Sequence, residues 1–169
     1  MFNKEMAFKK IINDPYQVVD EMVEGIVLAH SDLLKFANNN KRAVVRKDAP
    51  IKDKVGVLIG GGSGHEPAFL GYVGKGLADG AAIGNVFASP SPDPIVDATK
   101  AINGGKGVVY MYGNYAGDIM NFDMAAEMCQ MEDIPVKTVL VTDDIASAPL
   151  DKKSERSEEH TSELQSPLD

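Results

Sequence analysis

A glycine-rich segment in the first half of the chain carries the residues best suited to chemistry. It reads Gly-Gly-Gly-Ser-Gly-His-Glu-Pro over residues 60–67. Because glycine has no Cβ and tolerates positive φ, backbone N–H groups in such a segment can approach a polar ligand closely. The segment lacks the Gly-Lys-Ser/Thr ending of a Walker A loop, the third glycine of a dinucleotide fingerprint and the second glycine of a nucleophile elbow. It therefore predicts a polar-ligand site outside those three classes.

His65 follows these glycines directly, where a first helical turn is predicted over residues 66–70. The positive end of that helix would disfavour an imidazolium ion, so the ring would stay neutral and able to take a proton. The alternative is a structural histidine that caps the helix or bonds a nearby carbonyl. Glu66 is interpreted as a first-turn residue that the helix dipole stabilises.

Asp118 is the second candidate, at the end of a glycine-containing loop over residues 113–118. Its carboxylate could accept a hydroxyl proton or hold a polyol. It could equally be the N-cap of a helix that begins at Ile119. Asn114 and Tyr115 could line the same crevice, although turn formation and packing explain them as well.

Other acidic residues suggest no metal site. Asp143 and Asp144 are neighbours after an apolar run, and such pairs are typical of solvated or capping positions. We therefore assign no metal.

The elements that must position these candidates alternate along the chain. Asp14 and Pro15 indicate a helix start. The apolar residues that follow share one helical face, which we expect in the core: Val18, Val19, Met22, Val23, Ile26 and Val27. Further helices are expected over 95–102, with a left-handed cap at 103–105, and from Ile119 onward, whereas apolar runs indicate strands over 55–59, 81–83, 107–112 and 136–141.

This alternation predicts an α/β fold, with a mostly parallel sheet and helices on both faces. In such sheets ligands bind beyond the carboxyl ends of the strands. The segment after Ile59 and the loop after Tyr112 both leave strands at that edge. We expect the two to form one crevice.

Composition excludes several classes of protein. The 169 residues, 44% of them apolar, suffice for one domain with a sizeable core, and 25 acidic against 17 basic residues disfavour a nucleic-acid or anionic-membrane surface. No window approaches the roughly 18 apolar residues of a membrane span, and the start lacks the order of a secretory signal, so a cytoplasmic location is expected. The lone Cys129 is expected to be a small buried hydrophobe.

The end of the chain does not follow this pattern. From Arg156 the sequence has no periodic apolar face and too little hydrophobic content to become ordered. It resembles the translation of a sequencing-library adapter. We therefore expect residues 1–156 to be native and residues 157–169 to be a non-native, disordered tail.

Three motifs in order resemble the DhaK-type dihydroxyacetone kinase family. They are the glycine segment at 60–67, Ser-Pro-Ser-Pro-Asp at 89–93 and Asn-Tyr-Ala-Gly-Asp at 114–118. The resemblance implies that residues 1–156 are the N-terminal part of a sugar-binding domain, covering less than half of a family-length subunit.

The resemblance also implies a substrate and roles for the site residues. A short ketose such as dihydroxyacetone would be bound by Gly62, Ser63, Gly64, His65 and Asp118, with His65 and Asp118 handling protons. A family histidine that holds the sugar covalently would lie in a later part of the chain, and His30 matches no family motif. Gly113 stands where better-known members carry a lysine, which leaves the exact ketose open.

The implied partners complete the reaction. The chain would bind no cofactor, and the phosphoryl donor would come from another domain or subunit, either as ATP with magnesium or through a phosphoprotein relay. The full-length protein would form a homodimer. This chain would be truncated and inactive alone, and the alternative is a sugar-sensing coactivator that binds the ketose without phosphoryl transfer.

Overall fold

The computed structural model of the chain describes residues 11–144 and 146–156. The predicted tail over residues 157–169 lies outside the described residues.

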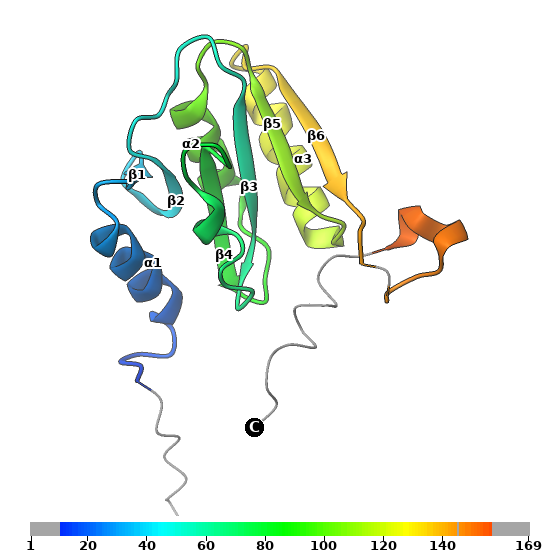
Figure 1. Cartoon of the computed structure of the whole chain (residues 1–169), viewed down its shortest axis with the longest axis horizontal. Helices are drawn as coiled ribbons and strands as arrows, with labels where there is room; N and C mark the ends of the chain where they lie inside the picture. The colour runs from blue at the N-terminus through cyan, green and yellow to red at the C-terminus, as the bar shows by residue number, and fades with distance from the viewer. Residues whose placement is uncertain (1–10, 145, 157–169) are drawn as a thin grey trace, which may run out of the picture.

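Within these residues, six strands form one mixed sheet (Figure 1). Their spatial order is β1-β2-β4-β3-β5-β6. The strands β4, β3, β5 and β6 are parallel, whereas β2 pairs antiparallel with both β1 and β4. The bounds are β1 Leu34–Ala37, β2 Asn40–Arg46, β3 Gly56–Ser63, β4 Gly80–Val86, β5 Val108–Gly113 and β6 Val136–Val141. The predicted α/β fold with a mostly parallel sheet is confirmed.

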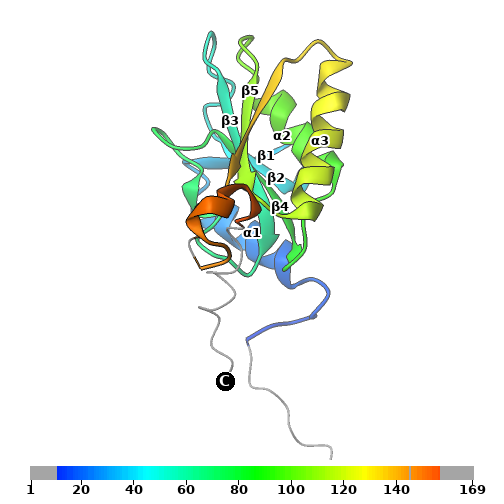
Figure 2. The same cartoon turned by 90° about the vertical axis from the view of Figure 1, so that its right-hand side faces the viewer.

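The helices cover both faces of this sheet. They are α1 Val18–Ala29, α2 Pro92–Ile102 and α3 Ala116–Gln130, with short 3₁₀ helices η1 Leu70–Tyr72 and η2 Leu150–Glu155. Alternate residues of β2 and β4 belong to two separate apolar clusters: Val45 and Ala82 pack with α2 and α3, whereas Val44 and Ala81 pack with α1 and η1. Figure 2 shows α2 and α3 together on one side of the strands. None of these helices is long and apolar enough to cross a membrane.

The helix boundaries refine the predictions. The buried face of α1 consists of Val19, Val23 and Val27, as expected, but the helix begins at Val18 and the Asp14 carboxylate instead accepts a hydrogen bond from the Tyr16 N–H at 2.9 Å. Helix α2 begins earlier than predicted, at Pro92, because proline suits the first helical positions. Within the predicted cap over residues 103–105, Gly105 is left-handed, with φ of 90°. The C-cap residue of α2 is Asn103, so Gly105 lies one residue beyond the usual position of a left-handed cap.

The hairpin of β1 and β2 was not predicted from the sequence. Asn38 and Asn39 connect its strands with φ of 48° and 58°. Two consecutive left-handed residues match the twist of a tight hairpin, and asparagine tolerates this conformation well. The Asn-Asn pair was the available signal.

The glycine segment is a strand for half of its length, so the strand predicted over residues 55–59 continues beyond its predicted end. Strand β3 continues to Ser63 and its glycines are buried. A Cβ added at Gly61 would lie 2.1 Å from a Phe69 ring carbon, and one at Gly60 would lie 3.0 Å from the Phe122 ring. These two glycines therefore let aromatic rings from both sides of the sheet pack against the strand.

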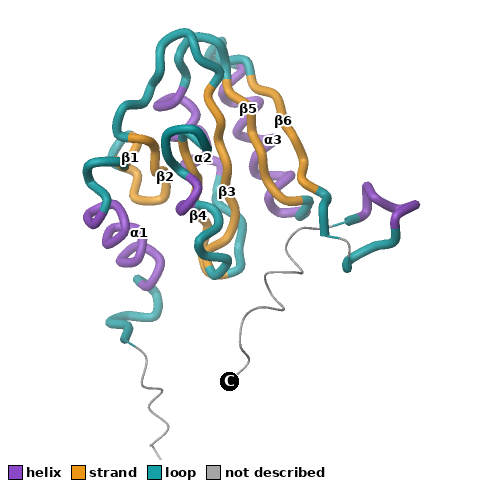
Figure 3. The backbone as a smooth tube through the Cα atoms, in the orientation of Figure 1, coloured by secondary structure: helices purple, strands orange, loops and turns teal. Residues whose placement is uncertain are grey.

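Ion pairs fix the amino edge of the parallel strands. Asp79, immediately before β4, is 3% exposed and bonds Arg46 Nη1 at 2.8 Å and the Val57 N–H at 2.9 Å. Lys54 also donates to Asp79, and Arg46 bonds Asp48 at 2.7 Å. The carboxyl edge, where the loops after β3, β4 and β5 begin (Figure 3), is built differently.

Candidate functional site

The end of β4 and the segment that follows it, residues 84–91, connect the two predicted halves of the site. Its Phe87 N–H donates to the Ser63 carbonyl at 2.8 Å, and the Phe87 ring contacts the His65 ring at a centroid distance of 5.4 Å. Ser89, on the same segment, lies against Gly117 and Asp118 at the start of α3. We call the group Gly62, Ser63, Gly64, His65, Ser89 and Asp118 the carboxyl-edge site.

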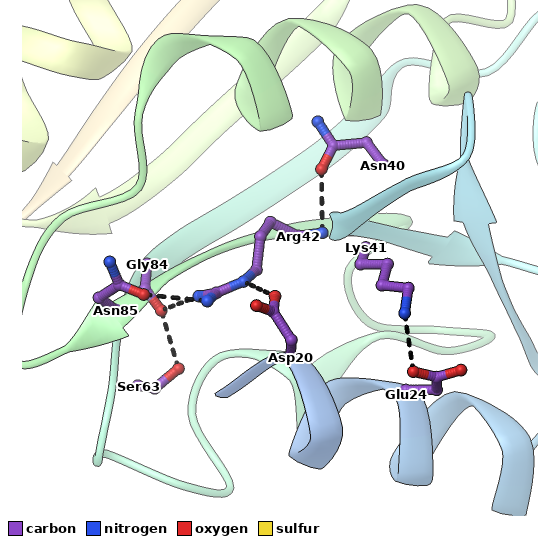
Figure 4. A network of polar contacts seen from close by, with 8 residues as sticks. All are labelled: Asp20, Glu24, Asn40, Lys41, Arg42, Ser63, Gly84 and Asn85. Atoms are coloured by element: carbon purple, nitrogen blue, oxygen red, sulfur yellow. Dashed lines mark hydrogen bonds and ion pairs between the residues drawn. The ribbon is translucent and has the colours of Figure 1, made fainter. Parts of the chain in front are cut away.

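Ser63 is buried and its hydroxyl already has a partner. Its Oγ donates to the Gly84 carbonyl at 2.9 Å, and Arg42 Nη1 donates to the same carbonyl at 3.0 Å (Figure 4). The Arg42 guanidinium also bonds Asp20 of α1 at 2.6 Å and Asn85 at 2.9 Å. Arg42 thus ties α1, β2 and β4 together. Because Ser63 and Arg42 both donate to the Gly84 carbonyl, the Ser63 hydroxyl helps to hold the site in shape.

Gly64 and Glu66 form a tight turn after β3. Gly64 has φ of 107°, and its N–H donates to the Glu66 carboxylate at 2.8 Å. Residues 64–69 are turns, and the 3₁₀ helix η1 begins only at Leu70, so the predicted helical turn at 66–70 is wrong. The Gly64 N–H nevertheless shows that this turn can bind an oxygen atom.

His65 is 9% exposed and lies between aromatic rings. Its ring meets Phe87 edge-on and Phe69 at a centroid distance of 6.4 Å. No helix begins at His65, so the helix-dipole argument for a neutral ring does not apply. The rings instead shield the imidazole from water and fix its orientation.

Asp118 is the most unusual carboxylate of the site. It is 1% exposed, and its Oδ1 has no hydrogen-bond partner among the described residues. Burial raises the pKa of Asp118 to about 6, and the nearby Ser89 hydroxyl opposes this rise. The N-cap of α3 is Tyr115, so the interpretation of Asp118 as a helix cap is wrong. A carboxylate with such a pKa can accept a proton near neutral pH.

The remaining candidates have structural partners. Asn114 donates to the Arg156 carbonyl at 2.7 Å, whereas Tyr115 is 43% exposed. Asp144 accepts a hydrogen bond from the Ala146 N–H at 2.9 Å, a local turn contact that caps no helix. Within residues 11–144 and 146–156, no three His, Cys, Asp or Glu side chains gather in a way that could hold a metal ion.

Ser89, Phe87 and Arg42 were missed as site residues by reasoning from the sequence. Ser89 belongs to the Ser-Pro-Ser-Pro motif, which was noticed but given no role. Ser89 and Arg42 also line a polar cavity of about 430 Å³ between α1, β4 and the start of α2. Only Ser89 had a sequence signal, because Phe87 and Arg42 act through partners distant in the chain.

Comparison with known proteins places these features in a family. The Dak1 domain model matches residues 24–158. The "PTS-dependent dihydroxyacetone kinase 2, dihydroxyacetone-binding subunit DhaK" of Listeria innocua is 55% identical over 140 residues, which are 83% of this chain and 42% of that protein.

Solved structures agree with this result. The native dihydroxyacetone kinase of C. freundii superposes with a TM-score of 0.78 at 36% identity, over 88% of this chain and 27% of that one. The dihydroxyacetone kinase operon co-activator DhaQ gives 0.69 at 33% identity, over 75% of this chain and 38% of that one. This chain spans less than half the length of each of these three proteins. Because the family model matches residues 24–158, which are most of the chain, this chain belongs to the Dak1 domain family.

Proposed function

We propose that the chain is the substrate-binding part of a dihydroxyacetone kinase, which holds a short ketose while its terminal hydroxyl is phosphorylated. The observation that carries this proposal is Asp118, a buried carboxylate whose pKa is raised to about 6 and whose Oδ1 has no partner among the described residues. Such a group suits a general base for a sugar hydroxyl. The 55% identity to a dihydroxyacetone-binding subunit supports the choice of substrate.

The other site residues would position the sugar. The Gly64 N–H and the backbone of Gly62 and Ser63 would bind its oxygen atoms, with the sugar replacing Glu66 as the acceptor at Gly64. His65 would be the second proton-handling group, held by the rings of Phe69 and Phe87. The Ser63 side chain would remain bonded to Gly84.

The phosphoryl group would come from outside this chain. The sugar hydroxyl oxygen would attack the phosphorus atom as its proton moves to Asp118, and the bond from phosphorus to the donor would break. The donor would be ATP with magnesium on another domain, or a phosphoprotein relay as the name of the Listeria innocua relative suggests. We propose that residues 1–156 are the N-terminal part of the sugar-binding domain, that the full-length protein is a cytoplasmic homodimer and that this chain alone transfers no phosphate.

The second candidate is a coactivator that binds the sugar without phosphoryl transfer. The 33% identity to the operon co-activator DhaQ favours it. The two candidates differ in one measurable property, which is turnover of dihydroxyacetone in the presence of a donor.

The test uses the full-length subunit with its donor subunit, and follows formation of the sugar phosphate. We expect Asp118→Asn and His65→Ala to lower turnover by about 10²–10⁴-fold, the usual contribution of general acid and base groups. Asp123→Asn, on the exposed side of the same helix, is the matched control and should retain activity. Binding of dihydroxyacetone without turnover in the unmodified protein would favour the coactivator, and unchanged turnover in both site variants would refute the assigned roles.

A further inference from the structure

The Ser-Pro-Ser-Pro segment has no part in the function proposed above, yet it packs against the catalytic aspartate's helix. A Cβ added at Gly117 would lie 2.6 Å from Ser89 Oγ, so the space where a side chain would stand is occupied by the Ser89 hydroxyl. Asn121 of α3 donates to the Pro90 carbonyl at 2.8 Å. These contacts hold Ser89 beside the first turn of α3, where Asp118 lies.

Two buried polar atoms meet at this point. Ser89 Oγ and Asp118 Oδ1 are both shielded from solvent, and within the described part of the chain neither makes a hydrogen bond of normal geometry. Leaving a buried donor or acceptor unmatched is costly. A serine hydroxyl can donate and rotates freely, and a carboxylate oxygen accepts. The two groups are therefore chemically complementary.

We propose that Ser89 is a positioning residue, whose hydroxyl donates to the Asp118 carboxylate, fixes its orientation and favours its ionised form. The catalytic consequence rests on the function proposed above, because it assumes that Asp118 accepts the proton of the sugar. The hydrogen bond between Ser89 and Asp118 does not depend on that function. Gly117 is required at its position because a larger side chain would push Ser89 away.

The electrostatic surroundings agree with this role. Burial raises the pKa of Asp118, whereas Ser89 lowers it. From β5, Tyr112 interacts with Asp118, and burial raises the pKa of Tyr112 to about 12, so it is neutral in the physiological range. From α3, Asp123 acts on the same tyrosine. Ser89 is thus the group shown to oppose the effect of burial on Asp118.

The first test titrates Asp118 itself by carboxyl ¹³C NMR, in this chain and in variants. Ser89→Ala should raise the Asp118 midpoint by about one pH unit, the size expected for loss of a hydrogen bond to a charged group. Ser89→Thr keeps the hydroxyl and should restore the midpoint. Ser91→Ala is the matched control, since Ser91 also precedes a proline and makes no side-chain bond at the start of α2.

An unchanged midpoint in Ser89→Ala, or an equal shift in Ser91→Ala, would overturn the proposal. If Ser89→Ala does not fold, Ser89→Cys keeps the size with a weaker donor and should still raise the midpoint. The second test uses the full-length subunit with its donor. There Ser89→Ala should move the acid limb of the turnover profile to higher pH, because the base needs a higher pH to lose its proton. A shifted midpoint without any turnover in the unmodified protein would retain the hydrogen bond and refute only the kinase function.

Discussion

Two aspartates at opposite edges of the sheet are almost equally buried but differ in their partners. Asp79 is 3% exposed at the amino edge, and Asp118 is 1% exposed at the carboxyl edge. Asp79 is matched by Arg46, Lys54 and the Val57 N–H. One Asp118 oxygen has no hydrogen-bond partner of normal geometry among the described residues, and burial raises the pKa of Asp118 to about 6.

The difference shows that burial alone does not mark a functional acid. A carboxylate surrounded by cations and an N–H group is committed to holding strands together. A buried carboxylate with few hydrogen bonds and no cation beside it destabilises the fold. Such destabilising groups are typical of functional sites. We therefore expect the amino edge of this sheet to carry stability and the carboxyl edge to carry the proposed chemistry.

The largest change in stability is expected at the amino edge of the sheet. Asp79→Ala should lower the free energy of unfolding by about 3 kcal/mol, because it leaves the buried Arg46 with only Asp48 and the Val57 N–H without an acceptor. Urea denaturation followed by circular dichroism measures this change. Glu132→Ala, which breaks an exposed pair with Lys100, is the control and should leave the denaturation midpoint unmoved. Similar effects for both variants would mean that the Asp79 cluster does not anchor the strands.

At the carboxyl edge, in contrast, we expect removal of a buried carboxylate to raise the free energy of unfolding. Asp118→Asn should raise the free energy of unfolding by about 2 kcal/mol at pH 7, because the ionised carboxylate is disfavoured by burial. The pKa of Asp118 in the folded state, about 6, exceeds its ordinary value of 3.8. The folded state therefore binds more protons between these two values, and the unmodified chain loses stability as the pH rises through this window.

The stability of the two proteins should thus converge below about pH 4 and differ most above pH 6. Urea denaturation across pH 4–8 measures the difference. A difference that stays constant with pH would show that Asp118 titrates normally, and the contrast between the two edges would then be lost.

The sequence predicted the framework of this site better than its contacts. The apolar period placed Val19, Val23 and Val27 in the core, and the end of β5 placed Asp118 at the carboxyl edge of the sheet. Both predictions rest on local patterns, which follow from helix and strand geometry. The glycines of β3 could not be recognised as part of a strand. Glycine is needed there because Phe69 and Phe122, from other parts of the chain, pack against the strand.

The roles of single polar groups were the hardest to predict. Ser63 and Asp118 were both predicted to contact the ligand, yet the Ser63 hydroxyl bonds the Gly84 carbonyl, whereas the Asp118 Oδ1 makes no hydrogen bond of normal geometry to a described residue. That difference depends on which tertiary partner lies within about 3 Å, which no spacing in the sequence specifies.

The smallest expected effect concerns Ser63, which belongs to the carboxyl-edge site but, like Asp79, has its polar side chain matched by a partner. Ser63→Ala should lower the free energy of unfolding by about 1 kcal/mol, the contribution of one neutral hydrogen bond, because Gly84 keeps its bond from Arg42. In the full-length subunit, the affinity for dihydroxyacetone should change less than threefold, a change of about 0.7 kcal/mol, as measured by calorimetry. A loss of affinity greater than tenfold with unchanged stability would instead mean that the Ser63 hydroxyl leaves Gly84 to bind the sugar. In that case Ser63 would be a sugar-binding residue as well as a structural one, and the contrast between matched and unmatched polar groups would not separate the two roles.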